Sequence, residues 1–352
     1  MFLNKYLIDM LDNKRFTLTD ALLKSLKRGK TSEQVLACDV MSLTYLQIGI
    51  LPQEVNQFVS ESRQLLVELL DDAECDPEVR AACAKTYSLA VFVANDPAYD
   101  NASVLNKLEA IFSHSYAKGD GSLRTFLPKV YDLHSAALSS WSLLLSIMPL
   151  SYVTKATQKH LSHLMDLLKS ADLDLRIAAG ETIALLFELA QCDPNADLKC
   201  FEDDGLFETL KALVSDSAKH RSKKDKKQQR ASFRDILKTI EEGEFDGQKI
   251  KFGTESLYID NWIRRKQYEA LREALATGLN AHLMQNEFVR EIFDLGSPLQ
   301  ASEASRRSLA AGMSRHQKTL FNKEQFRNKT KFMNKRREIK ENQTGAGEDA
   351  DD

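Results

Sequence analysis

Glycine and proline are scarce in this sequence, and their scarcity limits the kinds of fold that it can form. Of 352 residues, 14 are glycine and 7 are proline, whereas average usage would give about 25 and about 18. A fold rich in turns and long loops needs more of both. Because leucine and alanine are common and the hydrophobic content of 43% is enough for a continuous core, the composition predicts a mostly α-helical protein.

Cysteine is also sparse, and long apolar runs are absent. The cysteines are odd in number, fall mostly within helical patterns and lack the Cys-x-x-Cys spacing of zinc ribbons; they are Cys38, Cys75, Cys83, Cys192 and Cys200. We interpret them as reduced packing residues of an intracellular protein. No window approaches about 18 apolar residues, and the start of the chain lacks the pattern of a signal peptide. The sequence therefore predicts no membrane span and no membrane partner.

The motifs of catalytic and metal sites are missing as well. The sequence contains no phosphate-loop glycine pattern, no nucleophile elbow and no clustered carboxylate site. His160 and His163 stand three residues apart, but no third ligand lies nearby, so a solvated helix face explains them better than a metal site. The prediction is a protein that is not an enzyme, with no catalytic residues, no cofactor, no metal and no small-molecule substrate.

Amphipathic helices in pairs, separated by short breaks, are expected from Phe16 to about Ser217, with four pairs ending near Gln191. A motif recurs within them, since Asp76-Pro77-Glu78-Val79-Arg80 matches Asp172-Leu173-Asp174-Leu175-Arg176 at an offset of 96 residues. Further matches follow at Ala82 with Ala178, Thr86 with Thr182, Leu89 with Leu185 and Ala94 with Ala190. Two units of about 48 residues suit a HEAT or armadillo repeat. The alternative is a coincidental match between two amphipathic helices of a non-repeating bundle.

The repeat pattern also predicts what its shared residues do. Asp76 and Asp172 are expected to start the second helix of their pairs, and the small residues that follow permit close helix packing. The arginine of each motif, Arg80 or Arg176, is expected to bridge to an acid in the neighbouring repeat.

The predicted fold is a HEAT/armadillo-like helical solenoid, followed by a small, mainly helical C-terminal domain and a long basic C-terminal helix. The expected regions are a repeat domain at 1–218, the small domain with a basic lead-in at 219–300, the basic helix at 301–341 and a disordered acidic tail at 342–352. The first repeat is expected to be incomplete, because the helix Leu3–Leu11 has no partner before it.

The small domain is expected to combine a hairpin with helices. Its predicted elements are strands at Lys249–Phe252 and Leu257–Ile259 and helices at Ala231–Glu242, Tyr268–Ala276 and Leu279–Leu295. The basic stretch before Ala231 is either a linker or the start of a helix. Tyr258 and Trp262 are expected to be core residues rather than surface anchors, because a small domain needs aromatic core.

Charge is distributed unevenly along the chain. Ser305–Lys340 holds twelve lysines and arginines against Glu324 and Glu338, a net charge of +10, and Lys219–Arg230 holds seven cations against Asp225, a net charge of +6. The whole chain carries −3, so taking away +10 and +6 leaves −19 for the rest. Affinity for polyanions should therefore be confined to the two basic segments.

The basic end is predicted to be a helix that is ordered by an anionic partner, with nucleic acid as the first candidate. Lys323, Arg327, Lys331 and Lys335 recur every four residues and would stack on one helix face. The alternative is a nuclear-import tail. The candidate RNA-binding residues are Arg306, Arg307, Arg315, Lys318, Lys323, Arg327, Lys329, Lys331, Lys335, Arg336 and Arg337, joined by Lys226, Lys227, Arg230 and Arg234. The second group is either a phosphate contact or a solvated linker.

Three segments in order resemble the interferon-related developmental regulator family: KKDKKQQRASFRDIL (Lys223–Leu237), KIKFGTESLYIDNW (Lys249–Trp262) and NEFVREIFDLGSP (Asn286–Pro298). The resemblance implies an armadillo-like helical domain, this C-terminal domain and a basic tail. It also implies a non-enzymatic regulator, linked to transcriptional co-regulation and to binding translationally inactive ribosomes with the C-terminal helix in the mRNA path. One departure is that family members carry a low-complexity arm and a further helical unit before the point matching Asn4, so we expect a shortened isoform or an incomplete gene sequence.

Two functions of different classes follow. In the first, the protein is a cytoplasmic translational regulator that binds the ribosome, both rRNA and ribosomal proteins, and blocks mRNA with its basic helix. In the second, it is a nuclear co-regulator whose helical repeats act as a scaffold for protein partners and whose basic segments direct import.

Overall fold

The computed structural model describes residues 11–95, 101–193, 198–215 and 222–298 of the chain. In these residues helices dominate, and the one sheet is a two-stranded hairpin. The mostly α-helical prediction is confirmed. No helix in these ranges is both long enough and apolar enough to cross a membrane.

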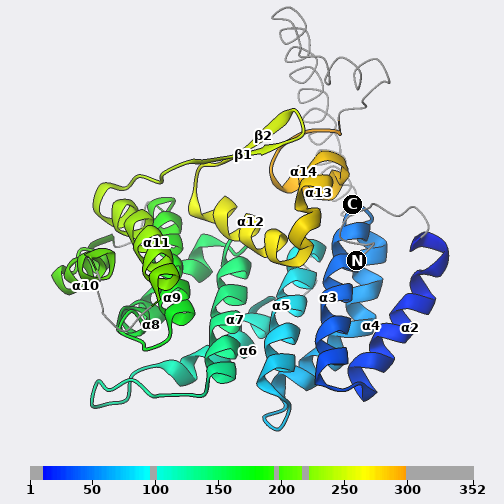
Figure 1. Cartoon of the computed structure of the whole chain (residues 1–352), viewed down its shortest axis with the longest axis horizontal. Helices are drawn as coiled ribbons and strands as arrows, with labels where there is room; N and C mark the ends of the chain where they lie inside the picture. The colour runs from blue at the N-terminus through cyan, green and yellow to red at the C-terminus, as the bar shows by residue number, and fades with distance from the viewer. Residues whose placement is uncertain (1–10, 96–100, 194–197, 216–221, 299–352) are drawn as a thin grey trace, which may run out of the picture. The chain divides into compact units, whose positions relative to one another are not determined.

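Helix pairs follow one another along the chain (Figure 1). The pairs are α2 (Leu11–Arg28) with α3 (Thr31–Ile48), α4 (Pro52–Asp71) with α5 (Pro77–Ala94), α6 (Asn101–Phe112) with α7 (Pro128–Leu145), α8 (Leu150–Leu167) with α9 (Leu173–Gln191), and α10 (Asp204–Ser215) with α11 (Lys223–Glu242). Short 3-10 turns, η1 (Ser113–Ser115) and η2 (Leu198–Phe201), lie between some of them. The second helix of each pair packs on the second helix of the next, from α3 through α5, α7 and α9 to α11. This is the repeat-like packing expected from the sequence, and it adds a fifth pair, α10 with α11.

The recurring motif has the same local role in both of its copies. Asp76 accepts a hydrogen bond from the amide of Glu78 (2.9 Å) and starts α5, and Asp172 accepts from the amide of Leu175 (2.8 Å) and starts α9. The matched threonines are equivalent too. Thr86 Oγ1 lies 3.0 Å from Ser42 Oγ on α3, and Thr182 Oγ1 lies 2.7 Å from Ser142 Oγ on α7. A buried Ser–Thr hydrogen bond thus joins successive second helices at both places.

The motif arginines differ from the expectation. Arg80 Nε donates to the carbonyl of Leu70 (3.0 Å), and Arg176 donates to the carbonyls of Ser170 and Ala171 and to the side-chain amide oxygen of Gln229. Both guanidinium groups donate to main-chain oxygens at the turn inside their own pair, and Arg176 also reaches the amide of Gln229 in the next pair. Arg176 is 1% exposed, and a buried guanidinium needs several acceptors, which the last carbonyls of a helix and its following turn supply.

The described residues form two compact units. The first falls within 8–248 and 258–274 and contains the helix pairs and all but the last residue of α12 (Trp262–Leu275). The second falls within 249–257 and 275–298. The expected short helix at Leu3–Leu11 lies outside the described residues except for its last position, as do the basic helix at 301–341 and the acidic tail at 342–352. The expected domain limits remain predictions.

The second unit is organised by a buried arginine. It contains most of the hairpin of β1 (Gln248–Phe252) and β2 (Glu255–Ile259), with η3 (Ala276–Gly278), α13 (Leu279–Gln285) and α14 (Glu287–Ile292). Arg290 is 1% exposed, and its guanidinium pairs with Glu255 on the hairpin (2.8 Å) and donates to the carbonyls of Leu283 (2.7 Å) and Gly296 (2.8 Å). One side chain therefore ties together the hairpin, α13 and the loop after α14.

The single helix expected at Leu279–Leu295 is wrong, because the chain breaks at Asn286. Asn286 has extended backbone angles (φ −82°, ψ 110°), and its side-chain oxygen accepts from the amide of Val289 (3.2 Å). Asparagine can start a helix through its side chain, which makes it a natural break in an otherwise helical pattern. The hairpin and the turn at Gly253 agree with the prediction.

Helix α12 is fixed to the repeats at its first turn. Glu188 on α9 accepts hydrogen bonds from the amides of Trp262 (2.7 Å) and Ile263 (3.1 Å), which would otherwise lack partners. The Trp262 ring is fully buried and its Nε1 donates to Thr239 on α11 (2.8 Å). Trp262 is thus a core residue as expected, whereas Tyr258 is 55% exposed, so the expectation of a core position is wrong for it.

Further along α12, charged side chains hold it to the repeats. Lys266, 5% exposed, forms an ion pair with Glu181 on α9 and lies 3.6 Å from Glu269. Arg265 pairs with Asp235 on α11 at 2.9 Å. Burial alone would lower the pKa of Lys266, but the carboxylates of Glu181 and Glu269 raise it, so the lysine keeps its charge. At the other end, Lys85 on α5 pairs with Glu273 at 2.6 Å in solvent.

Lys266→Met should destabilise the folded chain by about 3–5 kcal/mol, because it leaves the Glu181 carboxylate buried with only the more distant Arg265, 3.8 Å away, as its cation. Lys85→Met removes an exposed pair on the same helix and should cost less than about 1 kcal/mol. The measurement is the free energy of unfolding from urea titrations of both variants. Equal losses would show that the buried pair has no special role.

A histidine network lies between α6, α7 and α8. His160 is 1% exposed, and its ring nitrogens lie 2.6 Å from the hydroxyl of Tyr116 and 3.0 Å from Glu109. The ring of His163 stacks on that of Tyr116, with centroids 4.4 Å apart. The solvated helix face expected for His160 is therefore wrong, since this residue belongs to the core. The described residues contain no group of three or more His, Cys, Asp or Glu side chains suited to a metal ion.

His134 should make the protein less stable in acid. Its ring is buried against Ser115 (Nδ1 to Oγ, 2.5 Å), and burial, followed by the charges of His114 and Arg80, lowers its pKa to about 4. Between the unfolded pKa of about 6.5 and about 4, the unfolded chain binds a proton that the folded chain does not. Stability from this group is therefore present above pH 6.5 and falls by up to about 3 kcal/mol as the pH drops toward 4.

Urea unfolding at pH 7, 6 and 5 measures this effect, with His134→Gln as the comparison. The variant should lose less stability than the original chain over this interval. Parallel losses in the two chains would assign the acid sensitivity to other groups.

Candidate nucleic-acid interface

The basic stretch before Ala231, predicted to be either a linker or the start of a helix, contains the start of helix α11. Ser222 precedes the first turn, and its hydroxyl accepts a hydrogen bond from the amide of Asp225 (3.0 Å). Asp225 is also favourable near the positive end of the helix dipole, whereas Lys223 and Lys224 are not. The helix therefore forms in spite of its first lysines, so the local fold does not explain their presence.

Four cations form a stripe along one side of α11. Lys223, Lys227, Arg230 and Arg234 are spaced by four, three and four residues, and all four are exposed. We call these four residues the α11 stripe. They extend over about 16 Å of helix at about 1.5 Å per residue. No carboxylate of the described ranges lies within ion-pairing distance of any of the four.

A different side of α11 is buried, which fixes where the stripe points. Gln229, Phe233, Ile236 and Ile240 repeat at the same spacing and form the face that packs on α9. Gln229 accepts from Arg176 on α9 (2.9 Å) and donates to the carbonyl of Leu213 on α10 (3.1 Å). Because this buried amide connects three helices, α11 cannot rotate without breaking its hydrogen bonds.

Gly180 sets the distance between α9 and α11. A Cβ atom at this position would lie 2.8 Å from Cε1 of Phe233 and 2.9 Å from Cδ1 of Ile236, both on buried side chains. Glycine is therefore needed for the close approach of the helix that carries the stripe.

Gly180→Ala should destabilise the fold by about 1–2 kcal/mol, because overpacking against α11 outweighs the better helix propensity of alanine. Gly119→Ala is the matched control, since its Cβ would meet nothing within 4 Å. Thermal unfolding of both variants tests this. A Gly180→Ala chain as stable as the control would mean that α9 and α11 are not tightly packed.

The predicted RNA-binding residues divide into two groups. Lys227, Arg230 and Arg234 are exposed members of the stripe, and the half-exposed Lys226 is next to them. Sequence reasoning missed Lys223, although its spacing to Lys227 was visible. The remaining eleven lie outside the described residues: Arg306, Arg307, Arg315, Lys318, Lys323, Arg327, Lys329, Lys331, Lys335, Arg336 and Arg337.

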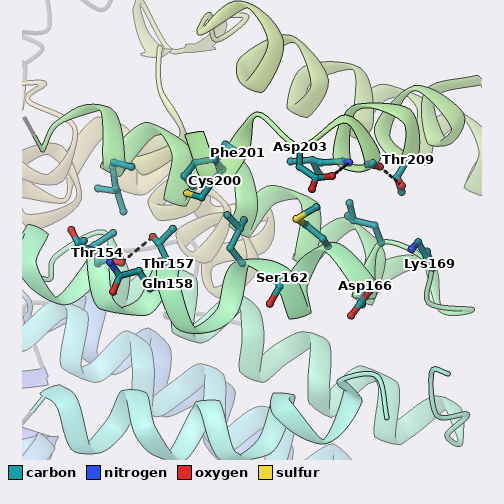
Figure 2. Close-up of a pocket in the computed structure, with 18 residues that line it drawn as sticks. Thr154, Thr157, Gln158, Ser162, Asp166, Lys169, Cys200, Phe201, Asp203 and Thr209 are labelled. Carbon is teal, nitrogen blue, oxygen red and sulfur yellow. Dashed lines mark hydrogen bonds between the residues drawn. The ribbon is translucent and has the colours of Figure 1, made fainter. Parts of the chain in front are cut away.

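A cavity of about 560 Å³ is also present between α8, the end of α9, η2 and α10 (Figure 2). Its polar groups are largely engaged within their own helices. Thr157 donates to the carbonyl of Val153 (3.0 Å), Thr209 donates to that of Gly205 (2.7 Å), and Asp203 accepts from the amide of Leu206 (2.9 Å). Figure 2 shows Asp166 and Asp203 on opposite sides of the cavity. The cavity thus lacks the convergent arrangement of polar groups that a catalytic site requires.

The fold is that of a helical-repeat protein, and its α11 helix carries a stripe of four exposed cations without carboxylate partners among the described residues. Comparison with known sequences gives the family. The pattern of "Interferon-related developmental regulator (IFRD)" matches residues 1–241, and that of "Interferon-related protein conserved region" matches residues 286–340. The second match includes the whole basic segment Ser305–Lys340.

Individual relatives agree along nearly the whole chain. Interferon-related developmental regulator 1 of Sus scrofa is 37% identical over 95% of this chain and 74% of its own length, and that of Homo sapiens is 36% identical over 95% and 73%. Interferon-related developmental regulator 2 of Mus musculus is 38% identical over 95% and 75%. The chain belongs to the interferon-related developmental regulator family, a family of regulators, as the three sequence segments predicted.

Proposed function

We propose that this protein is a non-enzymatic translational regulator that binds inactive ribosomes and places its basic C-terminal segment, residues 301–341, in the path of the mRNA. The observation that carries the proposal is the α11 stripe. Its four cations face solvent without carboxylate partners, on a helix whose orientation is fixed by buried contacts. Such a surface suits a ligand that carries several negative charges.

The contacts would be made with phosphates rather than with base edges. Lysine and arginine in a regular stripe meet a polyanionic backbone regardless of its sequence. Within the C-terminal segment, Ser305–Lys340 carries +10 in thirty-six residues, and as a continuous helix this stretch would be about 54 Å long. A rod of this length and charge suits a narrow channel walled by RNA.

The acidic remainder of the chain supports a localised interface. Of the −19 outside the two basic segments, −5 lies in residues 341–352 and −14 in the rest of the chain. A net negative charge disfavours RNA over most of the repeat surface, so contacts are expected mainly at the stripe and at the C-terminal segment. The location that fits this role is the cytoplasm, with rRNA and ribosomal proteins as partners.

A second candidate function is that of a nuclear co-regulator whose repeats bind protein partners. The observation that favours it is a groove of about 940 Å³ along α3, α5, α7 and α9 with α12 beside it. Cell fractionation separates the two functions. If the protein fractionates with polysome-free ribosomes and loses this association after RNase treatment, the translational function is supported. If it fractionates with chromatin complexes, the nuclear function is supported.

Co-sedimentation with purified ribosomes at increasing salt tests the main proposal. Replacing the twelve cations of Ser305–Lys340 with glutamine should abolish co-sedimentation at physiological salt. Replacing the four cations of the α11 stripe with glutamine should reduce the slope of log affinity against log salt concentration by about 3. Each lost phosphate contact contributes about 0.7–0.9 to this slope, and four contacts are lost.

The matched control replaces four other exposed cations with glutamine, three in α2 and one between α2 and α3: Lys24, Lys27, Arg28 and Lys30. Lys27 and Arg28 lie in the last turn of α2, where they complement the negative end of its dipole, and Lys30 is the residue before α3. The control should keep the original salt slope. Undiminished ribosome binding by the chain that lacks its C-terminal cations would refute the proposal.

A further inference from the structure

The groove along the second helices of the repeats is rich in carboxylates. Its lining includes seven aspartates and glutamates against four lysines and arginines. All of the lining residues belong to the first compact unit, so the groove is a feature of that unit alone. Its net charge is negative, which makes it unsuited to nucleic acid.

Most of its cations already have partners. Lys266 pairs with Glu181, Lys85 with Glu273 (2.6 Å), and Lys129 with Glu78 (3.1 Å). These pairs hold α12 to the repeats or connect neighbouring repeats. They leave little positive charge to neutralise the remaining carboxylates of the groove.

Three carboxylates of the groove are unpaired among the described residues: Asp39 on α3, Asp132 on α7 and Asp174 on α9. Burial raises the pKa of Asp39 and of Asp174, and the charges of Asp172, Asp132 and Asp225 raise that of Asp174 further. Asp132 and Asp174 both line the groove, on helices α7 and α9 that pack against each other. A cation bound between these two helices would meet both carboxylates and offset their charge.

A buried hydroxyl in the same wall also lacks a partner. Ser135 follows Asp132 by three residues on α7, so the two side chains share a helix face. Ser135 lines the groove and is 9% exposed, and its Oγ has no hydrogen-bond partner among the described residues. A buried polar atom without a partner is costly, and a ligand that donates a hydrogen bond would relieve that cost.

The ligand that these groups fit is an organic cation rather than a metal ion. The described residues include no group of three or more His, Cys, Asp or Glu side chains suited to a metal ion. A guanidinium group has five N–H donors in a planar fork and can serve two carboxylates and a hydroxyl together. The groove runs past several repeats, which suits an extended peptide.

We propose that this groove binds an arginine-rich extended segment of a partner protein, with one guanidinium between Asp132 and Asp174 that also donates to Ser135 Oγ. A second basic side chain meets Asp39 at the α3 end. The inference deepens the second candidate function, because it names the chemistry of the partner and the residues that contact it. It does not depend on RNA binding.

Fluorescence anisotropy of a labelled twelve-residue peptide with alternating arginine and serine tests the proposal on the full chain. A peptide with glutamine in place of arginine is the ligand control. The arginine peptide should bind, and the glutamine peptide should bind at least about tenfold more weakly, since each lost charge-assisted contact is worth about a factor of ten.

Protein variants locate the site. Asp132→Asn with Asp174→Asn should weaken peptide binding about tenfold or more. The matched control, Asp20→Asn with Glu208→Gln, removes the same charge from exposed positions on α2 and α10 and should change binding less than about twofold. Ser135→Ala should weaken binding about threefold without lowering the melting temperature, because the hydroxyl makes no hydrogen bond in the free protein.

Three results would overturn the proposal. One is equal weakening by the groove variant and its matched control, and another is equal binding of the two peptides. The third is that the arginine peptide binds only after the C-terminal cations of the chain have been replaced. That result would mean that the protein's own basic segment occupies the groove. None of these results bears on ribosome co-sedimentation, so the two proposals can fail separately.

Discussion

The buried ion pair between Lys266 and Glu181 is the interaction on which the first compact unit most depends. Each charge is stabilised in the interior mainly by the other, with Arg265 3.8 Å from Glu181 and Glu269 3.6 Å from Lys266, so the packing of α12 on α9 brings these charges together. Glu188 adds to the same joint by accepting from the first amides of α12. A helix that follows the repeats by some twenty residues is thus a part of their packing, and it forms one side of the acidic groove.

Two groups of cations in this protein differ in their surroundings. Arg176, Lys266 and Arg290 are buried and surrounded by carbonyl or carboxylate oxygens, so their charges stabilise the fold. The α11 stripe is exposed and has no carboxylate partners in the part of the chain that the structure describes. Because the fold does not need its charges, an external polyanion is the simplest explanation for them. The acidic groove presents the opposite sign, so the two proposed partners would not compete for one surface.

Much of the fold could be predicted from the sequence because its signals are local. The capping role of Asp76 and Asp172 and the repeat that they mark depend on helix starts and apolar spacing. The roles of Arg80 and His160 could not be predicted, since their acceptors become neighbours only after packing. Within α11, the spacing of the cations was visible in the sequence. Their exposure was not, because it depends on Gln229 and Gly180 fixing the helix against α9.

The central claim is that RNA meets this chain at its two basic segments and avoids its acidic repeats. Ultraviolet cross-linking of the full chain to ribosomes, followed by mapping of the cross-linked peptides, tests it most directly. Cross-links should concentrate in Lys223–Arg234 and Ser305–Lys340 and should be absent from the groove-forming helices α5 and α7. Cross-links spread over the repeat helices, or absent from both basic segments, would contradict the account.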